Sequence, residues 1–88
     1  MADLIFSEIA WAEYVEWLTT DKATAKRINS LLKEIMRTPF EGTGQPEALK
    51  HELAGKWSRR INRKDRLVYE VTTDAIRIMQ CKGHYDDK

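Results

Sequence analysis

The hydrophobic residues change their spacing halfway along the chain. Up to residue 37 they recur at i, i+3, i+4 and i+7, the spacing of one helix face, in two sets: Trp11, Tyr14, Val15 and Leu18, then Ile28, Leu31, Leu32 and Ile35. From Trp57 onwards they alternate with polar residues, which is typical of strands with one buried face. This change of period predicts a pair of helices followed by an antiparallel sheet, that is, an α+β fold.

Residues that favour caps and turns divide these patterns into elements. Ser7 follows a short apolar strand signal at 3–6 and is suited to cap the first helix, Asp21 offers a cap for the second, and Thr38 precedes a proline that stops it. Three strand signals follow at 57–61, 67–71 and 76–81, joined by turns at 62–65 and 72–75. We therefore predict a single domain over residues 1–88 with the order β-α-α-β-β-β, in which an N-terminal helical pair packs on one face of a mostly antiparallel four-stranded sheet.

The segment between the helices and the last three strands has the composition of a loop. Residues 38–55 contain both prolines and three of the four glycines. A loop of this length inside a small domain is usually functional or mobile. It carries Glu47 and Lys50, and we expect a short turn of helix near 46–49.

Positive charge is concentrated in one part of the chain. Between Lys50 and Arg66 there are seven basic and two acidic residues, a balance of +5, although the whole chain carries only +1. Residues 1–21, by contrast, carry five acidic residues and no Lys or Arg. Because the basic residues fall in strand and turn positions rather than on one helix face, they favour an anionic partner such as a nucleic acid.

The predicted sheet brings polar side chains from distant parts of the chain to one end. With the tip of the last hairpin at 73–74, Arg66 lies near Cys81, and the chain then continues past the same end of the sheet. Four residues are expected to share this end: Arg60, Arg66, His84 and Tyr85. Nothing in the pattern places Glu47 there; the length of its loop only permits it.

Several kinds of site are not favoured by the sequence. The single cysteine, Cys81, has no partner for an internal disulfide, and the two histidines lie far apart without the spacing of metal ligands, so we expect no metal and no cofactor. No apolar run approaches the roughly 20 residues that span a bilayer. No basic segment followed by an apolar one opens the chain, so a cytoplasmic location is expected.

Five short motifs together resemble a known family. They are R-T-P-F-E-G at 37–42, P-E-A-L-K-H at 46–51, W-S-R-R-I at 57–61, R-L-V-Y at 66–69 and the closing H-Y at 84–85. The combined pattern covers nearly the whole chain and is similar to the YoeB toxins of the RelE superfamily of toxin–antitoxin modules. The resemblance implies an endoribonuclease that cuts mRNA without metal, chiefly in the ribosomal A site. It also implies a homodimer, and a YefM-like antitoxin that lays a C-terminal segment over the site.

The same resemblance implies roles for individual residues. Four of them match the family's catalytic set, as general base, phosphate-stabilising arginine, general acid and terminal aromatic residue: Glu47, Arg66, His84 and Tyr85. Three more are candidates for binding the substrate: Lys50, Arg59 and Arg60. Arg59 and Arg60 are adjacent in a strand and point to opposite faces, so at most one of them is expected to face the site.

Two features depart from the family pattern. Lys82-Gly83 replaces a bulkier approach to His84, which predicts a looser hold on the histidine. The chain also continues after the His-Tyr pair with Asp86-Asp87-Lys88, an extension that we expect to be dispensable.

Two other functions stay open on the residues alone. One is a non-enzymatic toxin of the same fold that acts by binding protein, like the ParE gyrase poisons, which would need no pairing of Glu47 with His84. The other is a plain RNA-binding module, whose binding would depend on salt while the RNA stayed intact.

Overall fold

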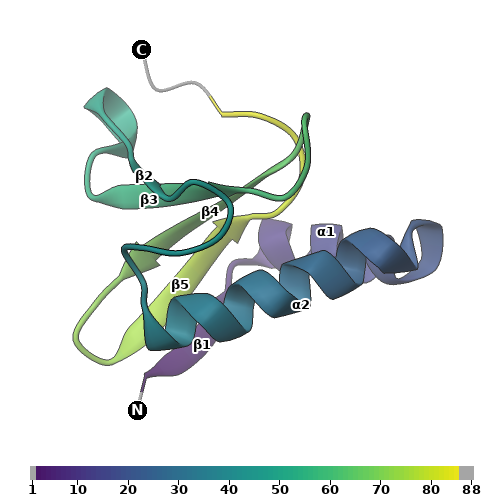
Figure 1. The fold of residues 1–88 in the computed structure, drawn as a ribbon, viewed down its shortest axis with the longest axis horizontal. Helices are drawn as coiled ribbons and strands as arrows, with labels where there is room; N and C mark the ends of the chain where they lie inside the picture. Colours follow the sequence, from purple (N-terminus) through teal and green to yellow (C-terminus); the bar gives the residue numbers. More distant parts are fainter. Residues whose placement is uncertain (1, 86–88) are drawn as a thin grey trace.

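The computed structural model describes residues 2–85. Along the chain the elements are β1 (Asp3–Phe6), α1 (Glu8–Thr20), α2 (Lys22–Arg37), β2 (Glu47–Ala48), a 3₁₀ turn (His51–Leu53), β3 (Lys56–Arg60), β4 (Arg66–Val71) and β5 (Ala75–Gln80). Figure 1 shows both helices on the same side of the sheet. The expectation for Asp86-Asp87-Lys88 concerns residues outside the described part of the chain and stays a prediction.

The strands form one five-stranded sheet in the order β1-β5-β4-β3-β2. β1 runs parallel to β5, and the other neighbours are antiparallel. The α+β class and the helical pair on one face are confirmed, but the predicted number of four strands is wrong because β2 is an additional strand. β2 also replaces the helical turn expected near 46–49. It forms because Glu47 and Ala48 pair with Ser58 and Trp57 of β3, so a distant partner, rather than the local sequence, determines its conformation.

The core lies between the helical pair and the sheet. The four hydrophobic residues predicted for α2 are all buried: Ile28, Leu31, Leu32 and Ile35. They pack in one cluster with residues of β4 and β5, namely Leu67, Tyr69, Ile76 and Ile78. Cys81 is buried in the same cluster, and burial, followed by the nearby Glu13 and Asp65 carboxylates, raises the pKa of its thiol to about 12.

Both helices begin at the predicted caps. The Ser7 hydroxyl accepts a hydrogen bond from the Ala10 amide at 3.0 Å, and an Asp21 carboxylate oxygen accepts one from the Thr24 amide at 3.1 Å. These bonds satisfy amides that have no partner within the first turn of a helix. α2 ends at Arg37, as the proline after Thr38 predicts.

α1 packs through a different face from the one that its sequence indicates. Ala10 is buried and Tyr14 and Trp17 pack against the core. Three residues of the predicted stripe are instead exposed, by 53%, 40% and 41%: Trp11, Val15 and Leu18. α1 is rotated about its axis relative to the predicted orientation because polar groups on its inner side bond to the segment after β5. For example, the Trp17 indole donates to the Cys81 carbonyl at 2.8 Å.

A bulge in β5 changes the register of the last hairpin. Met79 is an extra residue between two paired positions, Ile78 opposite Tyr69 and Gln80 opposite Val68. The sequence predicts Arg66 near Cys81, and in the structure the Arg66 amide donates to the Gly83 carbonyl, two residues further along, at 3.0 Å. The bulge therefore brings the residues after β5 closer to Arg66 than regular pairing would.

Candidate active site

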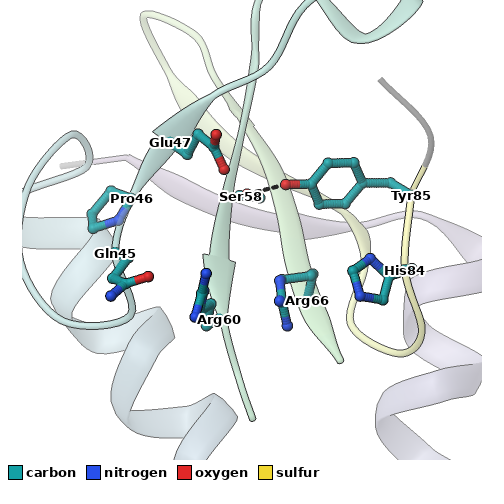
Figure 2. A pocket seen from close by; sticks show the side chains of 8 residues that line it. All are labelled: Gln45, Pro46, Glu47, Ser58, Arg60, Arg66, His84 and Tyr85. Carbon is teal, nitrogen blue, oxygen red and sulfur yellow. Dashed lines mark hydrogen bonds between the residues drawn. The ribbon is translucent and has the colours of Figure 1, made fainter. Parts of the chain in front are cut away.

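An open pocket of about 450 Å³ lies at one end of the sheet. Eight residues line it: Gln45, Pro46, Glu47, Ser58, Arg60, Arg66, His84 and Tyr85. In Figure 2, Glu47 lies above Arg60, Arg66 lies beside Arg60, and His84 follows on the far side of Arg66, with Tyr85 above it. The structure therefore brings together all four residues expected at this end of the sheet, and adds Glu47, which the sequence could not place.

Alternation along β3 explains which face carries the pocket. Ser58 and Arg60 line it, whereas Trp57 and Arg59 point to the opposite face, where Trp57 packs against the core cluster and Arg59 bonds to α2. The helices cover that opposite face. The pocket thus lies on the sheet face that the helices leave open.

Glu47 reaches the pocket because the loop after α2 is held against β3. The Arg60 amide donates to the Gly44 carbonyl at 2.7 Å, and a Cβ at Gly44 would lie only 3.0 Å from the Arg60 carbonyl oxygen. Gly44 also has a φ of +86°, which glycine adopts without strain. This close approach sets the chain on a path from which Glu47 pairs with Ser58.

Arg60 and Arg66 are direct partners on neighbouring strands. One nitrogen of Arg66, Nη1, donates to three carbonyl oxygens of the preceding turn, those of Asn62 at 2.9 Å, Arg63 at 3.3 Å and Asp65 at 3.2 Å. The guanidinium group is therefore fixed in direction. Two guanidinium groups side by side form a site suited to the oxygens of a phosphate.

The segment after β5 carries His84 and Tyr85 over the open face. The Tyr85 hydroxyl forms a hydrogen bond with the Ser58 hydroxyl at 2.9 Å (Figure 2). The prediction that Gly83 loosens the hold on His84 is wrong, because both backbone groups of Gly83 are bonded: its amide to Asp65 at 2.7 Å and its carbonyl to the Arg66 amide. Its φ of +77° is also one that a bulkier residue would adopt only with strain.

Arg59 is the candidate that the structure places on the opposite face of the sheet. Its side chain is fully buried on the helix side of the sheet and forms an ion pair with Glu34 at 2.5 Å. It also donates to the Tyr69 hydroxyl and to three carbonyls of the loop after α2, those of Thr38, Glu41 and Thr43. Arg59 therefore holds the loop that carries Glu47, and we withdraw it as a substrate-binding residue.

Lys50 is exposed and lies outside the set of residues that line the pocket. Three lining residues were missed by the sequence analysis: Gln45, Pro46 and Ser58. Ser58 could have been found, because it alternates with Arg60 and so shares its face. Gln45 and Pro46 could not, because their position depends on the folded path of the loop.

The pocket combines a carboxylate, two arginines and an imidazole on one open surface. A carboxylate and a histidine are groups that accept and donate protons, and arginines stabilise negative charge on a phosphate. Within residues 2–85 no three His, Cys, Asp or Glu side chains are grouped as a metal site requires. None of the described helices is long and apolar enough to cross a membrane.

Comparison with known proteins supports the class that the fold and pocket define, a small α+β toxin domain. A toxin structure from Agrobacterium tumefaciens described as YoeB/ParE is 40% identical and superposes with a TM-score of 0.92, covering 94% of this chain and 99% of that one. A YoeB dimer from Staphylococcus aureus is 46% identical with a TM-score of 0.90, covering 96% and 98%.

Sequence relatives narrow the class to one family. The toxin YoeB of Escherichia coli K12 is 55% identical over 82 residues, which is 93% of this chain and 98% of that protein. The family model for YoeB-like toxins of bacterial type II toxin–antitoxin systems matches residues 6–85. The chain belongs to this family.

Proposed function

We propose that the protein is a metal-independent endoribonuclease that cleaves mRNA, chiefly in the ribosomal A site, and so inhibits translation. The observation that supports this most is the pocket itself. Glu47, Arg60, Arg66 and His84 come from β2, β3, β4 and the chain end, yet all line one cavity. RNA carries its own nucleophile, the 2′-hydroxyl, so this set of groups is sufficient for cleavage.

In the proposed reaction Glu47 takes the proton of the 2′-hydroxyl while its oxygen attacks the adjacent phosphorus. The bond from phosphorus to the 5′-oxygen breaks, and protonated His84 gives its proton to that oxygen. The products are a 2′,3′-cyclic phosphate, which hydrolyses to a 3′-phosphate, and a free 5′-hydroxyl. Glu47 lies above Arg60 and His84 lies beside Arg66 (Figure 2), so the two groups stand at separate positions around the arginine pair, which suits these two roles.

Arg66 and Arg60 would meet the negative charge that develops on the phosphate. Preorganised donors are most effective when they need not move during the reaction, and the bonds of Arg66 Nη1 to the turn 62–65 hold it in that way. Tyr85, fixed by Ser58, would present its ring to a base. Lys50, outside the pocket, would add positive charge along the path of the RNA.

Primer extension on translated mRNA after brief expression tests the proposal directly. We expect cuts within the codon that occupies the A site for the wild type and none for His84→Ala. Intact mRNA with stalled gyrase would instead support a ParE-like poison, and RNA bound without cleavage would support a binding module. We also propose that the protein acts in the cytoplasm, where fractionation of expressing cells should recover it.

We propose two protein partners. The Staphylococcus aureus relatives include a YoeB dimer and a YoeB–YefM complex, which supports a homodimer and a YefM-like antitoxin here. The antitoxin would lay an acidic and aromatic segment over the basic edge of Lys50, Arg60 and Arg66. An acidic peptide should then raise the melting temperature in low salt and less so in high salt. Stabilisation that ignores salt would contradict this placement, and sedimentation of the free toxin checks the dimer.

A further inference from the structure

The turn between β3 and β4 is a rigid unit that lies against the chain end. The Asn62 side-chain oxygen accepts hydrogen bonds from the Lys64 amide at 2.8 Å and the Asp65 amide at 2.7 Å. The Ile61 amide donates to the Asp65 carbonyl at 3.0 Å, which closes the turn. Asp65 is consequently held in place with an exposed fraction of only 5%.

The buried Asp65 carboxylate joins this turn to the residue before His84. One of its oxygens, Oδ1, accepts from the Gly83 amide at 2.7 Å, and the other, Oδ2, accepts from the Asn62 side-chain amide at 3.0 Å. Hydrogen bonds to a charged acceptor are stronger than neutral ones. The Gly83 carbonyl in turn accepts from the Arg66 amide at 3.0 Å, so both peptide groups that flank Gly83 are tied to adjacent residues, Asp65 of the turn and Arg66 at the start of β4.

The same turn also fixes the guanidinium group of Arg66, through the three carbonyls that bond Nη1. The turn between β3 and β4 therefore determines both the position of the phosphate-binding arginine and the path of the backbone that leads to His84.

Three other contacts hold this segment. The Cys81 amide donates to Glu13 at 2.8 Å, and Lys82 pairs with Glu16. The Gln80 side-chain amide donates to the carbonyls of Lys82, Gly83 and His84 at 3.1, 3.3 and 3.3 Å. In the peptide group between Lys82 and Gly83, the amide donates to the charged Asp65 carboxylate at 2.7 Å, whereas the carbonyl accepts a longer bond that the Gln80 amide shares with two other carbonyls. The Asp65 bond is therefore the stronger hold on this peptide group.

We propose that Asp65, with Asn62 as its partner, is a positioning residue that sets His84 relative to Arg66. The proposal rests on the proposed ribonuclease function. Asp65 does not line the pocket, so it acts through Gly83. Glycine is the residue with the greatest backbone freedom, and without the carboxylate this peptide group is held only by the longer, shared bond from Gln80 and can rotate more freely. A displacement of about 1 Å in a reacting group costs on the order of 100-fold in rate.

A reciprocal exchange of the two side chains tests the hydrogen bonds themselves. Asp65→Asn turns a donor towards the Asn62 amide, so two donors face each other, and Asn62→Asp places two carboxylates together. In the double variant Asn62→Asp/Asp65→Asn, residue 62 becomes the acceptor and residue 65 the donor of their mutual bond, while the residue 65 oxygen still accepts from Gly83. Every bond is then restored with the net charge unchanged.

Single-turnover cleavage of an RNA oligonucleotide bearing the preferred cut site, on ribosomes where these are required, gives the main readout. We expect Asp65→Asn to lower the maximal rate about 10-fold to 100-fold with little change in the half-saturating RNA concentration. The double variant should recover to within about threefold of the wild type. Glu16→Gln, which removes the Lys82 ion pair beside Gly83, is the matched control and should stay within about twofold.

Hydrogen exchange of the Gly83 amide gives a readout that does not depend on cleavage. Exchange should be slow in the wild type and the double variant and fast in Asp65→Asn. A wild-type rate for Asp65→Asn would overturn the proposal. So would a folded double variant as slow in cleavage as the single one. If the wild type cuts no RNA, the proposed function fails, and the exchange measurement still decides whether Asp65 holds Gly83. If Asp65→Asn melts too low to assay, the double variant carries the test.

Discussion

Arg59 and Arg60 are neighbours in β3 with opposite surroundings. Arg59 is fully buried on the helix side of the sheet, where it binds Glu34 and the loop after α2. Arg60 is exposed and lines the pocket on the other side. Two identical side chains one residue apart therefore serve the fold on one face and, as we propose, the substrate on the other. Charge in a sequence indicates function only when the face that carries it is known.

The largest effect is expected from removing the buried arginine. Arg59→Ala removes the cation that pairs with Glu34, which keeps only its bonds from Thr43, and takes a donor from several loop carbonyls. It should lower the free energy of unfolding by about 3 kcal/mol or more. Arg60→Ala, the matched change on the other face, should alter it by less than about 0.5 kcal/mol while slowing cleavage about 10-fold to 100-fold. Denaturant unfolding and single-turnover cleavage measure the two quantities. An equal loss of stability in both variants would contradict the claim that the arginine on the helix side stabilises the fold and the one on the open face does not.

The catalytic set on the open face should affect rate and not folding. We expect Glu47→Ala, Arg66→Ala and His84→Ala each to lower cleavage at least about tenfold with the circular dichroism spectrum unchanged. Glu52→Ala and His51→Ala, which remove an exposed carboxylate and an exposed imidazole from the neighbouring 3₁₀ turn, are matched controls with near-normal rates. A near-normal rate for any of the three variants would remove that residue from the mechanism.

A smaller effect is expected when the pH is lowered, because Glu34, on the helix-covered face of the sheet, then loses its contribution to the free energy of unfolding. Hydrogen bonds from the Thr43 side chain and backbone, and then Arg59, lower the pKa of Glu34 from its usual 4.5. The folded state thus binds this proton less readily than the unfolded state. Its contribution to stability is full above about pH 4.5 and is lost as the pH falls through the lower, folded-state pKa. Unfolding measured from pH 7 to pH 3 should show a shallower loss for Glu34→Gln than for the wild type; parallel curves would contradict this.

Local sequence patterns predicted the helices and strands more accurately than they predicted the contacts between these elements. The helices, their caps and four of the five strands follow from spacing and from turn residues, because these depend on near neighbours. β2 and the bulge at Met79 depend on pairing with distant strands. The inner face of α1 depends on the chain end that it holds, so Trp11 was assigned to the core although it is half exposed.

The same reason limits what the sequence could say about the site. Arg60, Arg66 and His84 were expected together, since strand order and hairpin turns bring them to one end. Glu47 enters the pocket only because Arg59 and Gly44 hold its loop against β3, and no local pattern contains that information. Asp65 was missed for a similar reason, because its carboxylate acts on a residue 18 positions away.

The measurement closest to the central claim is cleavage of two RNA substrates that differ in one oxygen. One is all-ribose, and the other has a single 2′-deoxy nucleotide on the 5′ side of the cut. We predict that the first is cut in the presence of EDTA, leaving a 2′,3′-cyclic or 3′-phosphate end, and that the second is not cut. Efficient cutting of the deoxy substrate would show attack by water instead, and would contradict the account of Glu47 and His84 given above.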